Sequence, residues 1–180
     1  MGSQPIGEIE FTGMRVPTEN RIGAEGEGFN LAMRTLDAYR ASVGAAACGM
    51  ARRALYEALE YAKRREQFGA SISQFQLIQA KLAEMSTELD AARLLVYQAA
   101  YLSDLSNTAA PLTRAVSEAK LFATEAACRI VDSAVQIHGS QGLIRGSVVE
   151  RLYRDVRALR IYAGTSEIQK LVIASQLLKE

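Results

Sequence analysis

Three glycine-containing turns carry residue types that bind anionic groups. The first, RREQFG (64–69), combines positive charge with a planar aromatic ring, and the second, QIHGSQG (136–142), offers exposed backbone amides. The third, AGTSEIQ (163–169), places Gly164 and Thr165 at a helix start, where unpaired N–H groups attract phosphates and other anions. Composition alone favours a simpler interpretation, in which these are plain helix connections and Thr165 is an N-cap.

Few residues are suited to metal or acid–base chemistry. The single histidine, His138, stands beside Gly139, where it could transfer protons or cap a helix C-terminus, and we favour the structural role. Both cysteines, Cys48 and Cys128, lie in alanine-rich apolar segments and are predicted to be small buried residues with free thiols. One histidine with two cysteines does not predict a zinc site, so we expect no metal.

The composition is that of an ordinary globular protein. The 180 residues are 49% apolar and 23% charged, enough for one core and a fragment of a second domain. A net charge of +1 predicts no general attraction to nucleic acid. No apolar run approaches the ~20 residues that span a bilayer, and the N-terminus lacks the pattern of a signal peptide. We therefore expect neither membrane insertion nor a targeting segment.

The elements that must position these turns change character near residue 27. GEIEFTGMRV (7–16) predicts one strand ended by Pro17, followed by a polar, Gly-rich connection. A single strand cannot bury itself, so it either docks on helices or ends a domain that is absent from the chain. From Gly28 onward, apolar residues recur every three or four positions. We divide the chain into a β-domain remnant with linker (1–27) and a helical bundle (28–180).

Helical periodicity predicts long helices joined by short connections. Gly44 and Gly49 each weaken the first helix by roughly 1 kcal/mol, which predicts that another helix or a ligand approaches closely there. Ser147 and Glu150 form a capping-box pattern at the start of a later helix. The predicted fold is all-α, an up-down four-helix bundle preceded by a short N-terminal β-strand. The helical segments are expected at about 28–65, 73–105, 111–138, 147–159 and 165–178.

Taken together, these stretches resemble the acyl-CoA dehydrogenase family. In chain order they are GEIEFTGMRVPTENRIGAEGEGF, RREQFG followed by SQFQLIQAKLAEM, QIHGSQGLI, and VERLYRDVRALRIYAGTSEIQKLVIA. The similarity covers nearly the whole chain with matching gaps. Family members have an N-terminal helical domain, a middle β-domain and a C-terminal four-helix bundle. The resemblance implies that this chain holds the last strand of the middle domain and the C-terminal bundle.

The resemblance also implies an FAD cofactor bound at subunit contacts of a homo-oligomer, a dimer or a tetramer. Arg65, Phe68 and Gln76 would meet the adenosine and pyrophosphate of a neighbouring subunit's flavin. Thr165 and Glu167 would approach the cofactor of their own subunit. The second turn would line the pyrophosphate with Gln136, Ile137, His138, Gly139 and Ser140.

The implied substrate is an acyl-CoA thioester. Arg40 matches a family position near the acyl-CoA, and Tyr162, Ala163 and Gly164 would lie beside the reacting carbons. The family's reaction removes a proton from the carbon alpha to the thioester and a hydride from the beta carbon. It therefore needs a carboxylate within hydrogen-bonding reach of the alpha carbon.

Neither usual position for that carboxylate carries one. Most relatives have Glu where this chain has Ala163, and a minority supply it from the position of Tyr39, whose ordinary pKa of about 10 makes it a poor base. An Asp or Glu outside this chain could supply the base, or the chain could be a non-catalytic partner. The protein could instead perform flavin chemistry that needs no base, or Ala163 could be an introduced substitution.

The implied activity is α,β-dehydrogenation of an acyl-CoA in fatty acid metabolism, with electrons passed to an electron-transferring flavoprotein. The implied location is a bacterial-type cytoplasm or the mitochondrial matrix. We expect little activity from this chain alone, because much of the site would lie elsewhere. The alternatives are a non-catalytic helical assembly subunit and a flavin monooxygenase or oxidase of the same fold.

Overall fold

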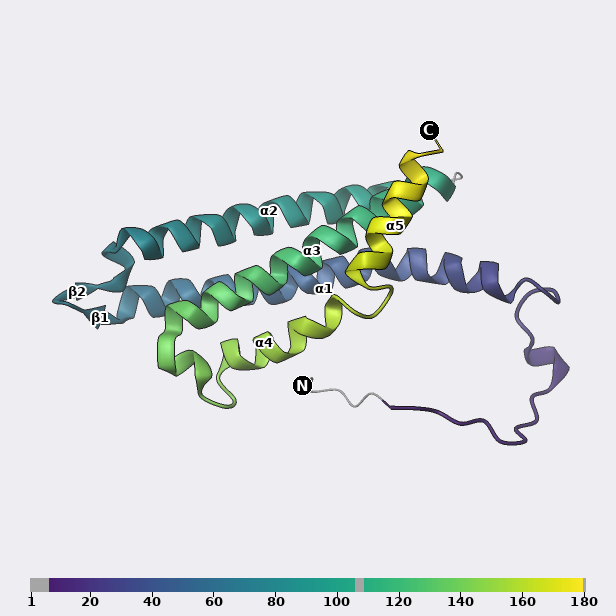
Figure 1. Cartoon of the computed structure of the whole chain (residues 1–180), viewed down its shortest axis with the longest axis horizontal. Helices are drawn as coiled ribbons and strands as arrows, with labels where there is room; N and C mark the ends of the chain where they lie inside the picture. Colours follow the sequence, from purple (N-terminus) through teal and green to yellow (C-terminus); the bar gives the residue numbers. More distant parts are fainter. Residues whose placement is uncertain (1–6, 106–108, 180) are drawn as a thin grey trace.

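In the computed structural model, which describes residues 7–105 and 109–179, five helices make up most of the chain (Figure 1). The segment 7–27 forms no strand, and its only regular element is the 3-10 turn η1 (Thr18–Asn20). Ile9 and Phe11 are 78% and 70% exposed. The predicted strand over 7–16 is therefore wrong for this chain, since no second strand among the described residues lies beside it to share hydrogen bonds.

The first helix, α1 (Gly28–Arg64), has the predicted length and buries a line of small residues. Gly44 lies where helices approach closely, because an added Cβ would sit 2.9 Å from Cγ2 of Val96 and 3.6 Å from the carbonyl oxygen of Ala119. This confirms the predicted close approach at Gly44. Among the described residues, no other helix approaches Gly49, whose added Cβ would meet nothing within 4 Å, so a ligand near Gly49 stays a prediction.

A short hairpin joins α1 to α2 (Gln76–Leu105). Strands β1 (Glu66–Gln67) and β2 (Ala70–Ser71) are antiparallel and are followed by the 3-10 turn η2 (Ile72–Gln74). Phe68 and Gly69 form the hairpin tip with φ of 54° and 80°, the positive values that tight hairpin turns require.

The central helix is α3 (Ala109–His138), which packs against α1, α2, α4 and α5. It continues into the 3-10 turn η3 (Gly139–Leu143), and α4 (Val148–Leu159) then returns along the bundle (Figure 1). The last helix, α5 (Ser166–Leu177), crosses the far end of α3. These elements confirm the predicted all-α bundle.

The core is built mainly from alanines contributed by α1, α2 and α3, and small side chains let these long helices pack closely. Larger apolar side chains such as Met85, Ile130 and Leu159 fill the remaining space. Both cysteines have free thiols; Cys48 is buried and Cys128 is partly buried. Charged side chains are rare in this interior, which makes the buried polar residues of α3 conspicuous.

Candidate functional site

The hairpin presents the first group of predicted site residues. Phe68 is 95% exposed and holds a left-handed backbone, a costly conformation for an aromatic residue. Arg65 and Gln76 are also exposed, at the end of α1 and the start of α2. An exposed ring, a cation and an amide are therefore grouped at one end of the bundle.

The turn after α3 lies at the same end. The ring of His138 stacks on Tyr61 of α1 with centroids 4.3 Å apart, and its Nδ1 lies 2.7 Å from the carbonyl oxygen of Ala134. Both contacts support the structural role that we favoured for this histidine. Gln136, Gly139 and Ser140 are exposed, whereas the side chain of Ile137 belongs to the core.

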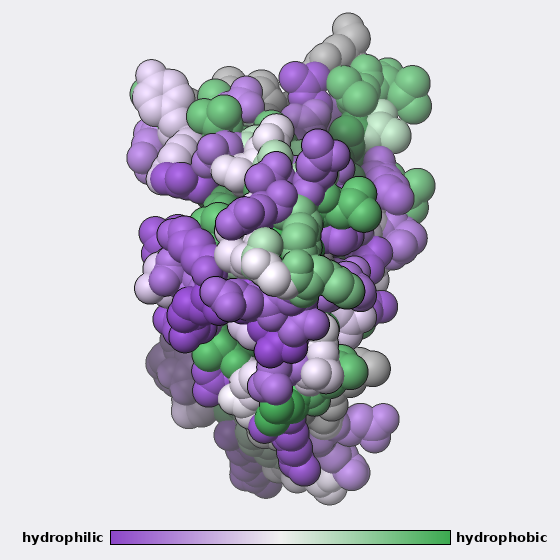
Figure 2. All heavy atoms as spheres, turned by 90° about the vertical axis from the view of Figure 1, so that its left-hand side faces the viewer, coloured by the Kyte–Doolittle hydropathy of each residue, from purple (hydrophilic) through white to green (hydrophobic). Residues whose placement is uncertain are grey.

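This end of the molecule mixes hydrophilic and hydrophobic side chains without one continuous hydrophobic face (Figure 2). Gly139 continues the turn with a φ of 56° and is exposed at the surface. The structure thus brings the hairpin and His138 groups together, but it leaves residues 162–167 in another part of the bundle (Figure 1).

The loop between α4 and α5 carries the second predicted group. Ala163 and Gly164 have positive φ values of 56° and 90°. The buried Lys120 donates a hydrogen bond from Nζ to the Gly164 carbonyl oxygen at 2.8 Å. Gln169, also fully buried, donates from Nε2 to the carbonyl oxygens of Ala163 and Gly164 at 3.0 and 3.2 Å. Two buried side chains therefore hold this strained turn.

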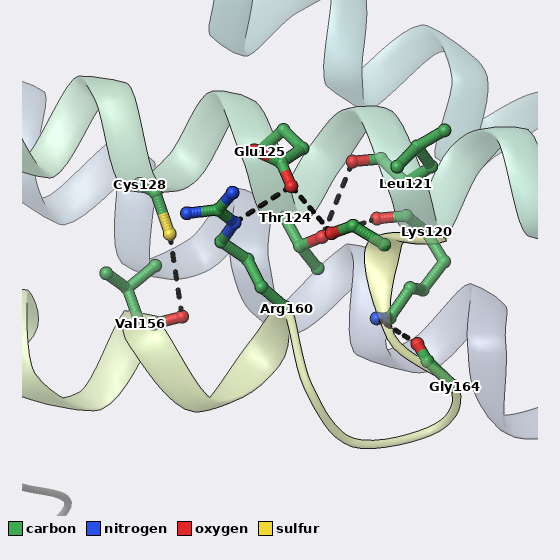
Figure 3. A network of polar contacts seen from close by, with 9 residues as sticks. Lys120, Leu121, Thr124, Glu125, Cys128, Val156, Arg160 and Gly164 are labelled. Atoms are coloured by element: carbon green, nitrogen blue, oxygen red, sulfur yellow. Dashed lines mark hydrogen bonds and ion pairs between the residues drawn. The ribbon is translucent and has the colours of Figure 1, made fainter. Parts of the chain in front are cut away.

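The base of the loop is closed by a carboxylate of α3. Glu125 accepts hydrogen bonds from Nε of Arg160 at 2.8 Å and from Oγ of Ser166 at 2.6 Å (Figure 3 draws the Arg160 contact). The N–H of Ser166 also donates to the carbonyl oxygen of Arg160 at 3.1 Å. Burial tends to raise the pKa of Glu125, but these hydrogen bonds prevail and lower it.

Arg40 lies beside the same turn, where its Nη2 is 3.8 Å from the Cβ that Gly164 lacks. It is 95% buried and pairs with Asp37 at 2.6 Å, and Asp37 also accepts a hydrogen bond from Thr113. Arg40 Nε and Gln169 Oε1 are buried without a hydrogen-bond partner among the described residues. Unsatisfied buried polar atoms are costly and rare in folded proteins, so these two mark this corner as unusual.

The remaining predicted residues lie nearer the surface. Tyr39 is 62% exposed, and Tyr162 is 45% exposed with a pKa raised by partial burial. Thr165 caps α5 by accepting a hydrogen bond from the N–H of Ile168 at 3.3 Å, as predicted. Glu167 is exposed in the first turn of α5, where a hydrogen bond from its own backbone N–H and one from Thr165 lower its pKa.

Sequence reasoning missed Lys120, Glu125 and Gln169. The spacing of Lys120 could have predicted its burial. It lies one turn after Val116 and one turn before Ala123, both on the apolar face of α3. Its pKa is lowered to about 8, mainly because the side chain is buried and in part because of the nearby charge of Arg40. No comparable signal marks Gln169, whose role depends on how α5 docks.

A groove of about 680 Å³ lies between α2, α3 and α4, and Glu125 and Arg160 at the base of the α4–α5 loop belong to its lining. It is lined by charged side chains that include Glu88, Arg129 and Arg157, but by none of the predicted site residues. Within the described ranges, no group of His, Cys, Asp or Glu side chains is arranged to hold a metal ion. None of the described helices combines the length and apolar character that a membrane span requires.

Together, the fold and its turns define an all-α domain whose candidate site residues lie at two separate places on a long bundle. Residues 26–178 match the model of the family described as acyl-CoA dehydrogenase, C-terminal domain. The chain belongs to the acyl-CoA dehydrogenase family.

Similar proteins agree with this assignment. The chain is 49% identical to a 3-(aryl)acrylate reductase of Clostridium sporogenes, over 97% of this chain and 46% of the relative. It is 47% identical to the CarC subunit of a caffeyl-CoA reductase–Etf complex of Acetobacterium woodii, over 96% of this chain and 45% of the relative. The structure superimposes on butyryl-CoA dehydrogenase of Megasphaera elsdenii with a TM-score of 0.87 and 43% identity, over 91% and 42% of the two chains. The chain thus spans less than half the length of these relatives.

Proposed function

We propose that this chain is the C-terminal helical part of an FAD-dependent acyl-CoA dehydrogenase that forms a double bond between the alpha and beta carbons of an acyl-CoA. The observation that carries the proposal is the family match over residues 26–178. Because the chain covers less than half of its relatives, we expect little or no activity from it alone. The cytoplasm of a bacterial cell or the mitochondrial matrix is the proposed location.

The exposed turns fit a flavin dinucleotide. Arg65 offers a cation to a pyrophosphate, and the exposed ring of Phe68 offers a stacking surface to an adenine. The backbone at Gly139, exposed at the same end, offers room for a close approach. FAD, when bound, would supply the oxidising chemistry, and Thr165 and Glu167 would face it from the first turn of α5. The separation of the two groups in one chain supports a site shared between subunits.

The turn at 162–164 is the proposed wall of the acyl site. Arg40 is held beside it by its ion pair with Asp37, and we propose that it orients a polar part of the substrate. Neither Ala163 nor Tyr39 offers a carboxylate for proton removal. We therefore propose that the base comes from another part of the complete protein.

The helical surface supports assembly into a homodimer or homotetramer. Leu94, Tyr97, Tyr101 and Leu105 recur at helical spacing on α2, and each is at least 60% exposed. A continuous apolar stripe of this kind is typical of an interface. Light scattering should detect multimers, and a monomer at high concentration would count against assembly through this chain. The similarity to a subunit of a complex with Etf supports an electron-transferring flavoprotein as redox partner.

The decisive experiment uses protein expressed from its complete reading frame and loaded with FAD. Anaerobic mixing with a panel of saturated acyl-CoAs should bleach the flavin absorbance with at least one of them. A thioester without hydrogen on the carbon beside the carbonyl serves as the control and should leave the absorbance unchanged. Because two relatives are reductases, the reduced protein is also mixed with α,β-unsaturated thioesters. An unchanged flavin spectrum in both arms would contradict the proposal.

The missing carboxylate favours a second candidate, a non-catalytic helical assembly subunit. In that case none of the acyl-CoAs bleaches the flavin of the wild-type protein. The variant Ala163→Glu gains bleaching, because a base now stands at the family position. Bleaching by the wild type itself would exclude this candidate. Oxygen consumption without alkene formation would instead indicate an oxidase or monooxygenase of the same fold.

A further inference from the structure

The backbone at residue 163 needs external support. An alanine with a φ of 56° occupies the left-handed region, which costs free energy relative to the ordinary helical or extended regions. The hydrogen bonds at the base of the loop leave the carbonyl groups of Ala163 and Gly164 unbound. Those two carbonyls are bound by Lys120 and Gln169 (Figure 3 shows the lysine contact). The conformation of residue 163 thus depends on side chains from two helices.

Lys120 is a costly residue to place there. It is 0% exposed on the apolar face of α3, and the charges that act on it are the cation Arg40 of α1 and the carboxylates Glu125 of α3 and Glu167 of α5. The hydrogen bond that it donates runs to the Gly164 carbonyl oxygen. Burial of a cation carries a large desolvation cost, and even complete buried ion pairs are often replaced by apolar side chains without loss of stability. Global stability therefore does not explain this lysine.

We infer that Lys120 is a positioning residue, which, together with Gln169, holds the 163–164 turn so that the side chain at position 163 leaves the backbone in one fixed direction. This inference rests on the proposed function for its meaning in catalysis, because position 163 is where the family usually carries its base. It assigns to α3 a role beyond bundle packing. Lys120 itself is not expected to touch the substrate.

The first experiment observes the turn directly in the 180-residue chain by NMR. In wild-type protein the ¹³C shift of the Gly164 carbonyl should titrate together with the ¹³Cε signal of Lys120. Lys120→Met removes the hydrogen bond while keeping an unbranched side chain of similar volume, so the titration at Gly164 should vanish. Amide exchange at Tyr162 and Ser166 should rise about tenfold or more, because a charge-assisted hydrogen bond is lost.

The matched control is Thr124→Val, one turn further along α3. The Thr124 hydroxyl is fully buried but donates only to carbonyl oxygens of its own helix, those of Lys120 and Leu121. Its loss should leave exchange in the turn within about twofold of the wild type. Equal loosening of the turn by both variants, or no loosening by Lys120→Met, would overturn the inference.

The second experiment measures flavin bleaching in the complete FAD-loaded protein. Lys120→Met should slow bleaching by about 10- to 100-fold with little change in acyl-CoA affinity, because small misplacements reduce rates steeply. Lys120→Arg, which retains a cation, should recover part of the rate. A loosened turn with an unchanged rate overturns the positioning role. If the wild type does not bleach at all, the proposed function fails, and the NMR result alone decides whether Lys120 fixes the turn.

Discussion

Two turns of this bundle contain residues with positive φ, and they are stabilised in different ways. The turn after α3, residues 139–146, has positive φ only at Gly139 and Gly146, and its backbone N–H groups donate to acceptors three or four residues away, as at Ile144 and Gly146. The loop from Arg160 to Ser166 contains a strained alanine and is held by side chains of α3 that are 35 to 44 residues away in sequence. The first turn is encoded locally, whereas the second is imposed by tertiary contacts.

The difference predicts how each turn responds to substitution. A locally encoded turn fails when its own glycines acquire side chains, since backbone cannot move aside cheaply. An imposed turn fails when a distant side chain is removed, and it can loosen without the bundle unfolding. Substitutions in the two regions can therefore test whether the distinction holds.

The largest effect is expected for Gly142→Ala in the local turn. The new Cβ would lie 2.7 Å from the Val135 carbonyl oxygen and 3.1 Å from Cβ of His138, so backbone must shift. We expect a loss of about 2–3 kcal/mol in the free energy of unfolding, measured by urea denaturation followed by circular dichroism.

Gly139→Ala is the matched control for this turn. Its added Cβ meets nothing within 4 Å, so only the strain of its φ of 56° remains, about 1 kcal/mol. Equal losses for the two variants would show that crowding against Val135 contributes nothing to the turn.

A smaller effect is expected for Glu125→Gln at the base of the imposed loop. The Glu125 side chain is 25% exposed, and its charge strengthens the hydrogen bonds from Arg160 and Ser166. Its loss should reduce the free energy of unfolding by about 1–2 kcal/mol at pH 7.

The effect of Glu125→Gln should also depend on pH in a defined direction. Folding lowers the pKa of Glu125. The contribution of its charge to the free energy of unfolding is therefore complete above the ordinary pKa of about 4.3, and it is lost as the pH falls through the lowered pKa. Unfolding curves of wild type and variant should therefore converge between about pH 5 and pH 2. A difference that persists unchanged at acid pH would show that charge is not what closes the loop.

The same distinction explains what the sequence could predict. Capping by Ser147 and Thr165 is local, and hydrogen bonds at both positions confirm it. The helices were predictable because apolar residues recur with a helical period along each one. The hydrogen bonds of Lys120 and Gln169 to the 163–164 turn were not predictable, because they depend on how α5 packs against α3.

The predicted strand over 7–16 failed for a related reason. Alternating apolar residues at Ile9 and Phe11 describe a strand correctly only when a partner strand supplies hydrogen bonds. The relatives in this family are about twice as long as this chain, and the assignment of this segment to a larger β-domain stays a prediction. An alternating apolar pattern shows that a segment can pair in a sheet. Whether it does so depends on a partner strand elsewhere in the polypeptide.

The smallest and most discriminating effect comes from the two helix caps. Ser147 and Thr165 are both partly buried, and each accepts one hydrogen bond of 3.3 Å from a backbone N–H of the helix that it starts. Ser147→Ala and Thr165→Ala should therefore each cost about 1 kcal/mol by thermal unfolding. If the loop before α5 is held by Lys120, Gln169 and Glu125, removal of the Thr165 cap adds no further loosening. A markedly larger loss for Thr165→Ala than for Ser147→Ala would mean that the cap also holds the loop, and the division between a local and an imposed turn would then be too sharp.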